Sequence, residues 1–289
     1  MVESVKKAKI LTEALPYIQR FSDKIVVVKY GGSAMTNPDL QAQVIRDLAL
    51  MKQVGMLPVV VHGGGKAISS WMEKLGMEAK FHKGLRITDG PAMELTEMVL
   101  AGKVNKELVH LFVQAGTKTV GLSGKDAGLL LAEKKQVEGA DLGFVGTVKT
   151  VDIEYVELLL AQGYLPVIAP IGFDLNGNSL NLNADEAASA IACALNAEKL
   201  VFLTDVDGVL KNPEDSSTLC SSLNRKEARA GMEAGWISGG MIPKIQMCLQ
   251  ALEQGVRQVH MLNGTWDHAL LLEIFTDQGI GTMIKEDEE

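Results

Sequence analysis

The stretch VVVHGGGKAISSW, residues 59–71, joins a run of β-branched residues to three glycines and the start of a helical pattern. This order is typical of an anion site, because the first N–H groups of a helix have no internal partner and lie at the positive end of its dipole. Glycines let a phosphate approach those groups without a side chain in the way. The stretch by itself is equally compatible with a plain tight turn, since short motifs have many chance matches.

Neither of the two common nucleotide motifs fits this turn. A Walker A loop would need a glycine and a hydroxyl residue where Val60 and Ala67 stand. A dinucleotide fingerprint would need its last glycine at the position of Ile68. The ligand of the turn must therefore be inferred from the rest of the chain.

The composition is that of an ordinary globular protein, with 47% hydrophobic and 22% charged residues among 289, enough for one large domain or two lobes. A net charge of −8 argues against a nucleic-acid partner, which needs a basic surface. No membrane partner is expected either, because no apolar run reaches the length of a membrane span and the first residues lack a signal-peptide pattern. Cys193, Cys220 and Cys248 form no C-x-x-C motif and are expected to stay reduced, as in a cytoplasmic protein.

Short apolar strands alternate with amphipathic segments along most of the chain. Six such strands are expected within IVVVKY (25–30), KQVGMLPVVV (52–61), TVGLSG (119–124), LAQGYLPVIA (160–169), LNAEKLVFLTD (195–205) and EQGVRQVHML (253–262). Continuous apolar strands separated by helices predict a mainly parallel sheet with both faces covered, which is a three-layer α/β/α sandwich. Residues 129–151 instead show the alternation of an antiparallel hairpin insert.

The chain shows no flexible linker, so two lobes would share one sheet. Apolar residues at helical spacing within residues 1–24 predict an N-terminal amphipathic helix, kinked near Pro16. We expect this extension to precede an N-lobe of residues 25–190 and a C-lobe of residues 191–289.

Parallel sheets bind ligands at the carboxyl ends of their strands, so the residues that follow each strand are the candidates for a site. Lys29 precedes the pair Gly31 and Gly32, and Lys244 follows a second glycine pair in SGGMIPK. A single lysine is usually only solvated. Several glycine turns together with two lysines at such positions predict a polyphosphate site.

The segment VFLTDVDGVL, residues 201–210, resembles two other kinds of site. Asp-x-Asp-Gly after an apolar strand is the nucleophile loop of haloacid-dehalogenase-type phosphatases. Those proteins carry the loop near their start and need a further acidic motif downstream, which we do not find after Asp207. A calcium loop would need a third oxygen ligand and a closing glutamate, and both are missing. Neither site is expected here.

Six motifs occur in an order that resembles the amino acid kinase family, namely KYGGSAM, VVVHGGGKAIS, GLRIT, SLNLNADEAA, LTDVDGVL and SGGMIPK. The pair GLR and NxNAD is similar to the acetylglutamate branch of that family, and the resemblance runs over residues 25–284. It implies transfer of phosphate from ATP to the side-chain carboxylate of N-acetyl-L-glutamate, a step of arginine biosynthesis, with Mg²⁺ carried by the ATP phosphates. It also implies that the N-lobe binds acetylglutamate and the C-lobe binds ATP.

The resemblance assigns roles to the residues that match its motifs. The expected catalytic residues are Lys29, Gly32, Gly65, Asp185 and Lys244. The expected acetylglutamate-binding residues are Gly64, Gly65, Arg86 and Asn181. The expected ATP-binding residues are Lys29, Asp205, Val206, Asp207, Gly208, Met241 and Lys244. His62 is interpreted as a structural histidine, and no residue is expected to ligate a metal.

These residue types suit the implied reaction. The attacking carboxylate is already ionised at neutral pH, with a pKa of about 4, so no general base is needed. Its approach to the γ-phosphate sets anion against anion, and Lys29, Lys244 and glycine N–H groups would offset this repulsion most strongly in the transition state. Asp185 would orient both lysines, and Arg86 would pair bidentately with a substrate carboxylate.

The resemblance also extends to regulation. Acetylglutamate kinases with such an N-terminal extension resemble the arginine-inhibited type, which implies a hexamer joined through N-terminal helices and inhibition by L-arginine. The alternative role for the helix is to cover apolar surface on its own subunit. The expected arginine-binding residues are Tyr17, Lys199, His268, Glu273 and Gly281, with Glu273 as the partner of the guanidinium.

Two alternative functions remain open at this point. The first is a kinase for another acidic amino acid, such as acetylaminoadipate, glutamate or aspartate, because one methylene changes binding by only about 1–3 kcal/mol. The second is a non-catalytic sensor of an amino acid with the same fold. The presence of both Lys29 and Lys244 argues against a sensor, which does not need paired charge stabilisers.

Overall fold

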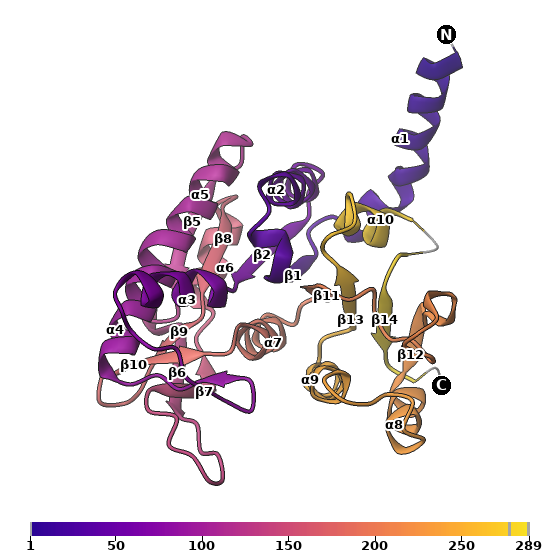
Figure 1. The fold of residues 1–289 in the computed structure, drawn as a ribbon. Helices are drawn as coiled ribbons and strands as arrows, with labels where there is room; N and C mark the ends of the chain where they lie inside the picture. Colours follow the sequence, from indigo (N-terminus) through magenta and orange to yellow (C-terminus); the bar gives the residue numbers. More distant parts are fainter. Residues whose placement is uncertain (1, 277–278, 288–289) are drawn as a thin grey trace.

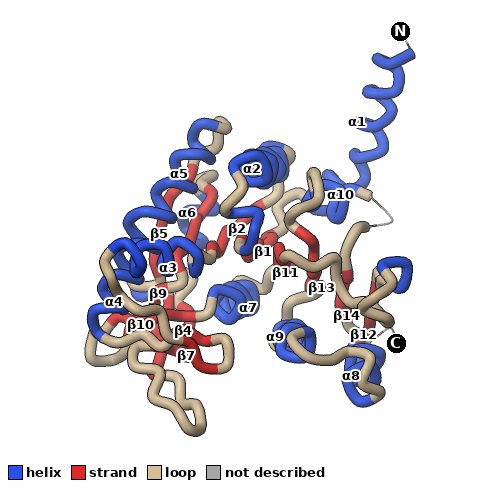
Figure 2. The backbone as a smooth tube through the Cα atoms, viewed as in Figure 1, coloured by secondary structure: helices blue, strands red, loops and turns tan. Residues whose placement is uncertain are grey.

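A computed structural model of the chain describes residues 2–276 and 279–287. Figures 1 and 2 show a central sheet with helices on both sides. The strands of this sheet are β1 (Ile25–Tyr30), β2 (Leu57–His62), β5 (Thr119–Ser123), β8 (Leu165–Ala169), β11 (Lys199–Thr204), β12 (Ser222–Asn224), β13 (Gln258–Asn263) and β14 (Thr282–Lys285).

The strand order is β12-β14-β13-β11-β1-β2-β8-β5. The six strands expected from the sequence are the six contiguous ones from β13 to β5, and all of their pairings are parallel. Strand β14 runs antiparallel to β13 and pairs in parallel with the short β12 at the edge. The prediction of a mainly parallel sheet is therefore confirmed, and the antiparallel edge was not predicted.

Both faces of the sheet are covered by helices, which confirms the three-layer sandwich. Along β1, Val26 and Val28 pack with one set of helices and Val27 packs with the other, so the unbroken apolar run serves two cores. The first set is α2 (Pro38–Gln53), α3 (Gly65–Lys74), α4 (Gly90–Glu97), α5 (Asn105–Gln114) and α10 (Ala269–Phe275). The second set is α6 (Glu154–Ala161), α7 (Ala184–Ala194), α8 (Arg225–Glu233) and α9 (Met241–Glu253).

The expected hairpin insert consists of β6 (Leu130–Lys134) and β7 (Val145–Val151), which pair antiparallel. It does not stand alone, because β9 (Ile171–Phe173) and β10 (Ser179–Leu182) close it into a small four-stranded barrel. A separate ribbon is formed by β3 (Phe81–His82) and β4 (Leu85–Arg86). The strands β3, β4, β9 and β10, of two to four residues each, are too short to show a periodicity in the sequence.

The N-terminal extension forms α1 (Val2–Phe21), with Pro16 inside the helix. Figure 1 shows α1 extending away from the rest of the molecule and meeting it near α10. Phe21, at the end of the helix, is buried against the body of the protein. No helix in residues 2–276 and 279–287 is long and apolar enough to cross a membrane.

Four short helical turns complete the fold of residues 2–276 and 279–287. Three are 3₁₀ turns: η1 (Gly32–Met35), η3 (Asp126–Gly128) and η4 (Ser216–Thr218). The fourth, η2 (Met98–Val104), is a π-helical segment that joins α4 directly to α5. Such segments are rare and occur frequently beside functional sites.

Candidate active site

The carboxyl ends of β1, β2 and β11 are neighbours in the sheet, because β1 pairs with both other strands. This brings Lys29, the glycine turn after β2 and Asp205 to the same edge. Lys29 Nζ lies 2.9 Å from Oδ1 of Asp185, which is in the first turn of α7. The ion pair is partly shielded from solvent, with 15% and 27% of the two side chains exposed. Two of the expected catalytic residues, Lys29 and Asp185, therefore form an ion pair in the structure.

Asp205 holds the glycine turn that follows β1. The backbone N–H of Ser33 donates to Asp205 Oδ1 over 2.7 Å. Gly32 has a φ of +68°, and a Cβ at this position would lie 2.6 Å from the same carboxylate oxygen. Only glycine fits this combination of a left-handed backbone and a close neighbour. The contact ties the end of β11 to the turn after β1.

The glycine turn after β2 is held between β1 and the helix segment η2. The N–H of Gly63 donates to the carbonyl of Tyr30 over 2.7 Å. A Cβ on Gly64 would lie 2.3 Å from Cδ2 of Leu100, which is itself buried. Gly65 then begins α3, so its N–H belongs to the unpaired first turn of that helix.

A cavity of about 230 Å³ adjoins this turn. It is lined by all four of the expected acetylglutamate-binding residues, Gly64, Gly65, Arg86 and Asn181. A second cavity, of about 340 Å³, is lined by Gly32, Gly64 and Gly65 together with residues of α3 and α5. Gly64 and Gly65 therefore line both cavities, whereas Gly32 lines only the second.

Arg86 is held in place by the first turns of α3. Its Nη2 donates to the carbonyl of Gly65 over 2.9 Å and to Oγ of Ser69 over 2.7 Å. Its Nη1 donates to the sulfur of Met72, and the guanidinium lies 4.8 Å from the centre of the Phe81 ring. Burial lowers the pKa of Arg86 below its usual range, although an arginine keeps its charge in proteins. Three of its five N–H donors are used, so the others can meet an anion in the cavity.

Asn181 is positioned by a chain of hydrogen bonds that ends at Arg86. Its Nδ2 donates to Oγ1 of Thr88 over 3.2 Å, and that hydroxyl donates to the carbonyl of Arg86. Thr88, the last residue of the motif GLRIT, is fully buried and was not among the expected site residues.

Apart from Lys29 on β1, the residues expected to bind ATP are spread along the loop after β11 and the start of α9. Oδ1 of Asp207 accepts hydrogen bonds from Asn263 and Trp266, whereas Val206 is half exposed. Gly208 lies close to Thr282, with φ at +142°. The first turn of α9 carries Met241 and Lys244.

Lys244 and Asp185 both act on one buried thiol. Burial raises the pKa of Cys248, Asp185 raises it further, and Lys244 lowers it. Lys244 lies in the first turn of α9, and α9 packs against α7, the helix that carries Asp185.

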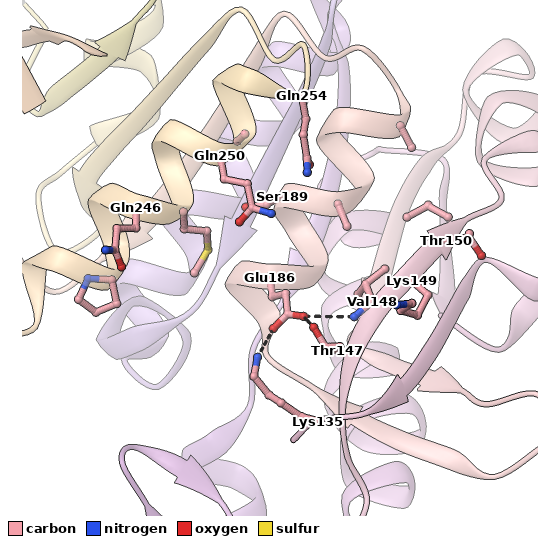
Figure 3. Close-up of a pocket in the computed structure, with 16 residues that line it drawn as sticks. Lys135, Thr147, Val148, Lys149, Thr150, Glu186, Ser189, Gln246, Gln250 and Gln254 are labelled. Carbon is pink, nitrogen blue, oxygen red and sulfur yellow. Dashed lines mark hydrogen bonds and ion pairs between the residues drawn. The ribbon is translucent and has the colours of Figure 1, made fainter. Parts of the chain in front are cut away.

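A larger cavity, of about 540 Å³, lies between α7, α9 and the barrel, and none of the expected site residues lines it. Figure 3 shows Glu186 pointing toward Lys135, Thr147 and Val148 in the lining of this cavity. Its carboxylate accepts hydrogen bonds from Lys135 Nζ over 2.7 Å, from the N–H of Val148 and from the hydroxyl of Thr147. Glu186 thus fastens the first turn of α7 to the barrel, next to Asp185.

Four of the five residues expected to bind arginine lie together. Tyr17, Lys199 and Glu273 line a cavity of about 260 Å³ between α1, β11, β13 and α10, and the N–H of Gly281 donates to Glu273. His268 does not line this cavity, because its Nδ1 bonds instead with Asp47 of α2 over 2.7 Å.

The cavity under α1 has a buried polar network that the sequence did not reveal. His260 lies between Glu273, 2.6 Å from its Nδ1, and Lys199, 3.0 Å from its Nε2. Burial lowers the pKa of Lys199 to about 8. Burial alone would raise the pKa of Glu273, but hydrogen bonds from His260 and from the amides of Ile280 and Gly281 hold it below its usual value. His260 was not predicted because it lies between the apolar residues Val259 and Met261 of a strand, and no motif marks it.

A family model described as the amino acid kinase family matches residues 24–263. The chain belongs to the amino acid kinase family. Its curated relatives within this family include the acetylglutamate kinase of Caldanaerobacter subterraneus subsp. tengcongensis, which is 54% identical over 98% of this chain and 94% of its own.

Solved structures of N-acetylglutamate synthase from Neisseria gonorrhoeae have the same fold as this amino acid kinase. The synthase complexed with coenzyme A and N-acetyl-glutamate is 28% identical, with a TM-score of 0.85 over 98% of this chain. The synthase complexed with coenzyme A and L-arginine is 27% identical, with a TM-score of 0.81 over 97% of this chain. This chain spans only 64% and 65% of those synthase chains.

Proposed function

We propose that this amino acid kinase transfers the γ-phosphoryl group of ATP to the side-chain carboxylate of N-acetyl-L-glutamate. The products are N-acetyl-L-glutamyl 5-phosphate and ADP, as a step of arginine biosynthesis. The observation that carries the proposal is one cavity lined by Arg86, Asn181, Gly64 and Gly65, next to the Lys29–Asp185 pair. The identity of about half of all residues with curated acetylglutamate kinases supports the same substrate.

In this mechanism the substrate carboxylate attacks the γ-phosphorus directly. Arg86 binds the other end of acetylglutamate, and Asn181 donates a hydrogen bond to it. Lys29 and the N–H groups of Gly32 and Gly65 stabilise the phosphoryl oxygens as their charge is redistributed in the transition state. The groups act by charge and hydrogen bonding alone, because the nucleophile has no proton to lose.

Asp185 keeps Lys29 in position for this role. The ion pair of 2.9 Å holds the ammonium at the end of β1, over the glycine turn. Lys244, from the start of α9, stabilises the charge that develops on the leaving phosphate. Asp185 carries the negative charge that orients both ammonium groups.

The proposed ATP site has two parts, hydrogen-bond donors that bind the phosphates and a loop that binds the nucleoside. We assign the phosphates to Lys29, Lys244 and the glycine turns, and the rest of the nucleotide to residues 205–208 and Met241. When bound, Mg²⁺ neutralises part of the phosphate charge. No group of three or more His, Cys, Asp or Glu in residues 2–276 and 279–287 forms a cage for a metal, so we assign Mg²⁺ to the ATP oxygens. This division makes residues 25–190 the acetylglutamate lobe and residues 191–289 the ATP lobe.

A coupled assay of ADP release over a panel of acidic amino acids tests the proposal. We expect the highest kcat/KM with acetylglutamate, and roughly 10- to 200-fold lower values with acetylaminoadipate, which has one more methylene. A preference for acetylaminoadipate, glutamate or aspartate would identify a different kinase. The absence of ADP release with every member of the panel would favour an amino-acid sensor.

We further propose that L-arginine inhibits this kinase by binding between α1 and the C-lobe. Glu273 is the one carboxylate among the described residues that line this cavity, which suits a guanidinium. The synthase from Neisseria gonorrhoeae, which matches this chain over 65% of its length, was solved in complex with L-arginine, and this supports the proposal. Tyr17, Lys199 and Gly281 remain in the proposal, and His268 does not.

The assembly and the location of the protein complete the proposal. We propose a hexamer joined through the α1 helices, because α1 projects from the body of the subunit (Figure 1). The three cysteines are unpaired, as in a protein of the reducing cytoplasm, where we place this kinase.

A further inference from the structure

His62 is the last residue of β2 and stands directly before the glycine turn. Its side chain is fully buried, and each ring nitrogen has a partner. Nδ1 lies 2.7 Å from the carbonyl oxygen of Gly63, and Nε2 lies 3.2 Å from the side-chain nitrogen of Asn105. The reaction proposed above uses neither nitrogen.

The partners of Asn105 determine how its amide group is oriented. Nδ2 lies 2.9 Å from the carbonyl of Val167 and 3.2 Å from the carbonyl of Leu122, which can only accept hydrogen bonds. Oδ1 lies 3.1 Å from the ammonium of Lys106, which can only donate. The nitrogen therefore points toward His62 as a donor.

These contacts determine the protonation state of the ring. A proton on Nε2 would face the amide hydrogens of Asn105, which are shared among three acceptors, and Nδ1 must donate to the carbonyl of Gly63. His62 is therefore the neutral tautomer with its proton on Nδ1. Burial and the nearby charge of Lys106 favour the same neutral state, and the pKa of His62 is lowered to about 4. A neutral ring buried in this way is not suited to act as an acid or a base at pH 7.

The hydrogen bond to Gly63 has a geometric consequence for the turn. The carbonyl of Gly63 and the N–H of Gly64 belong to one planar trans peptide, in which the two groups point in opposite directions. A ring that holds the carbonyl therefore also sets the direction of the Gly64 N–H. Gly64 lines both cavities at the site.

The helix segment behind the turn supports the same arrangement. In η2, the buried side chain of Leu100 occupies the space beside Gly64, and the residue after this segment is Asn105. One π-helical segment thus brings an apolar side chain against Gly64 and an amide against His62.

We propose that His62 and Asn105 are positioning residues that aim the Gly64 N–H at the anion bound between the glycine turns. The inference rests on the proposed function and names two residues that act on the reaction only through the backbone. Asn105 fixes the tautomer of His62, and His62 fixes the peptide between Gly63 and Gly64.

A set of substitutions at His62 separates this role from simple packing. The amide nitrogen of asparagine lies as many bonds from the backbone as Nδ1, and that of glutamine as many as Nε2. His62→Asn can therefore still donate to Gly63, whereas His62→Gln and His62→Leu lose that bond. We expect kcat to fall about 10- to 100-fold in the Gln and Leu variants, since a misplacement of about 1 Å can cost that much. The Asn variant should keep several times more of the wild-type kcat than the Gln variant. In all three variants KM for ATP should change less than kcat.

Two control substitutions are in α5, the helix that begins with Asn105. Phe112→Leu removes buried volume from α5 and should lower stability while leaving kcat within about twofold. His110→Asn, at an exposed position of α5, should change neither stability nor kcat. Equal losses in His62→Asn and His62→Gln would overturn the inference, as would a Leu variant that keeps more than half of kcat.

An NMR experiment tests the inference without the reaction. The imidazole ¹H–¹⁵N spectrum should show neutral His62 with its proton on Nδ1 between pH 6 and 8, and Asn105→Ala should change this pattern. The backbone signal of Gly64 should move in His62→Gln and move less in His62→Asn. A wild type that is inactive on acetylglutamate but gives these spectra would refute the proposed function alone. A proton on Nε2, or an unmoved Gly64 signal in His62→Gln, would refute the positioning role alone.

Discussion

At the scale of single residues, the proposed reaction needs positive charge more than it needs a proton acceptor. Lys29 already has its partner, Asp185, at 2.9 Å, and Arg86 is already tied to the start of α3. Charges held in place before the substrate arrives do not have to reorganise during the reaction. Substitutions at these residues should therefore affect function more than folding.

Replacement of either lysine should lower kcat with little loss of stability. We expect Lys29→Ala and Lys244→Ala each to lower kcat by roughly 10²–10³-fold, the usual cost of losing one preorganised stabiliser of charge. Steady-state kinetics at saturating substrates, together with a thermal melt, measures both effects. A variant that keeps more than half of the wild-type kcat would place that lysine outside the transition-state contacts.

Arg86→Lys should mainly raise KM for acetylglutamate. Lysine keeps the positive charge but loses the planar guanidinium that contacts Ser69 and the carbonyl of Gly65 and that we propose to bind the substrate carboxylate. Uniform binding of the substrate should therefore weaken more than the chemical step. Titration of each substrate in turn gives the two KM values, and an equal rise in both would assign Arg86 to the nucleotide or to the scaffold.

His62 predicts a loss of stability in acid. Its pKa is about 4 in the folded chain and 6.5 as an ordinary histidine, so the unfolded state binds more protons between these values. The free energy of unfolding should therefore fall as the pH falls from 6.5 to about 4, by up to roughly 3 kcal/mol from this residue. Chemical denaturation of the wild type and His62→Asn at several pH values measures this effect. The variant should lose less stability than the wild type over that range, and parallel pH curves would contradict the prediction.

At the scale of elements, the site is assembled by the ends of strands and the first turns of helices. The first turn of α7 carries both Asp185, which faces Lys29, and Glu186, which is bonded to the barrel. Adjacent residues of one helix thus connect the catalytic edge of the sheet with the barrel. The segment η2 packs Leu100 against Gly64 in the glycine turn after β2.

The contact between η2 and this turn can be tested by a double substitution. Gly64→Ala would place a Cβ 2.3 Å from Leu100, and overpacking of this kind costs about 1–3 kcal/mol. Leu100→Ala removes a buried side chain and should cost about 2–5 kcal/mol. In the double variant the alanine at 64 has room, so we expect a total loss smaller than the sum by about 0.5–3 kcal/mol. Additive losses in chemical denaturation would show that the two residues do not compete for space.

At the scale of the whole molecule, α1 together with β11, β13 and α10 forms one candidate regulatory unit. Tyr17 and Arg20 of α1 line the same cavity as Lys199 and Glu273. A ligand that binds there can change the position of α1 only if it binds two arrangements of the molecule unequally. This is the physical requirement for inhibition by an end product that resembles neither substrate.

Removal of α1 tests regulation separately from catalysis. We expect the full chain to be a hexamer with sigmoidal inhibition by L-arginine. Deletion of residues 1–20 should yield active dimers that have lost most of this inhibition, because the helix that joins the dimers and lines the cavity is gone. Light scattering and an arginine titration measure the two properties. A truncated enzyme that is still hexameric and equally inhibited would disprove the role of α1 and leave the kinase activity unaffected.

The sequence by itself determined the features that depend on local patterns. Six apolar strands, the glycine turns that follow them and the helix at the N-terminus were recognisable because each has its own periodicity or its own backbone requirement. Strand ends in a parallel sheet lie at one edge, which is why Lys29 and the turn at residues 63–65 could be placed together before the structure.

The tertiary structure decided which side chains meet. Closure of the barrel by β9 and β10, the bond between His268 and Asp47, and the hold of Asp205 on Ser33 all join segments distant in sequence. The tautomer of His62 depends on Asn105, which is 43 residues away along the chain. Such pairings are set by packing and by the need of buried polar groups for partners, and neither leaves a periodic mark on the sequence.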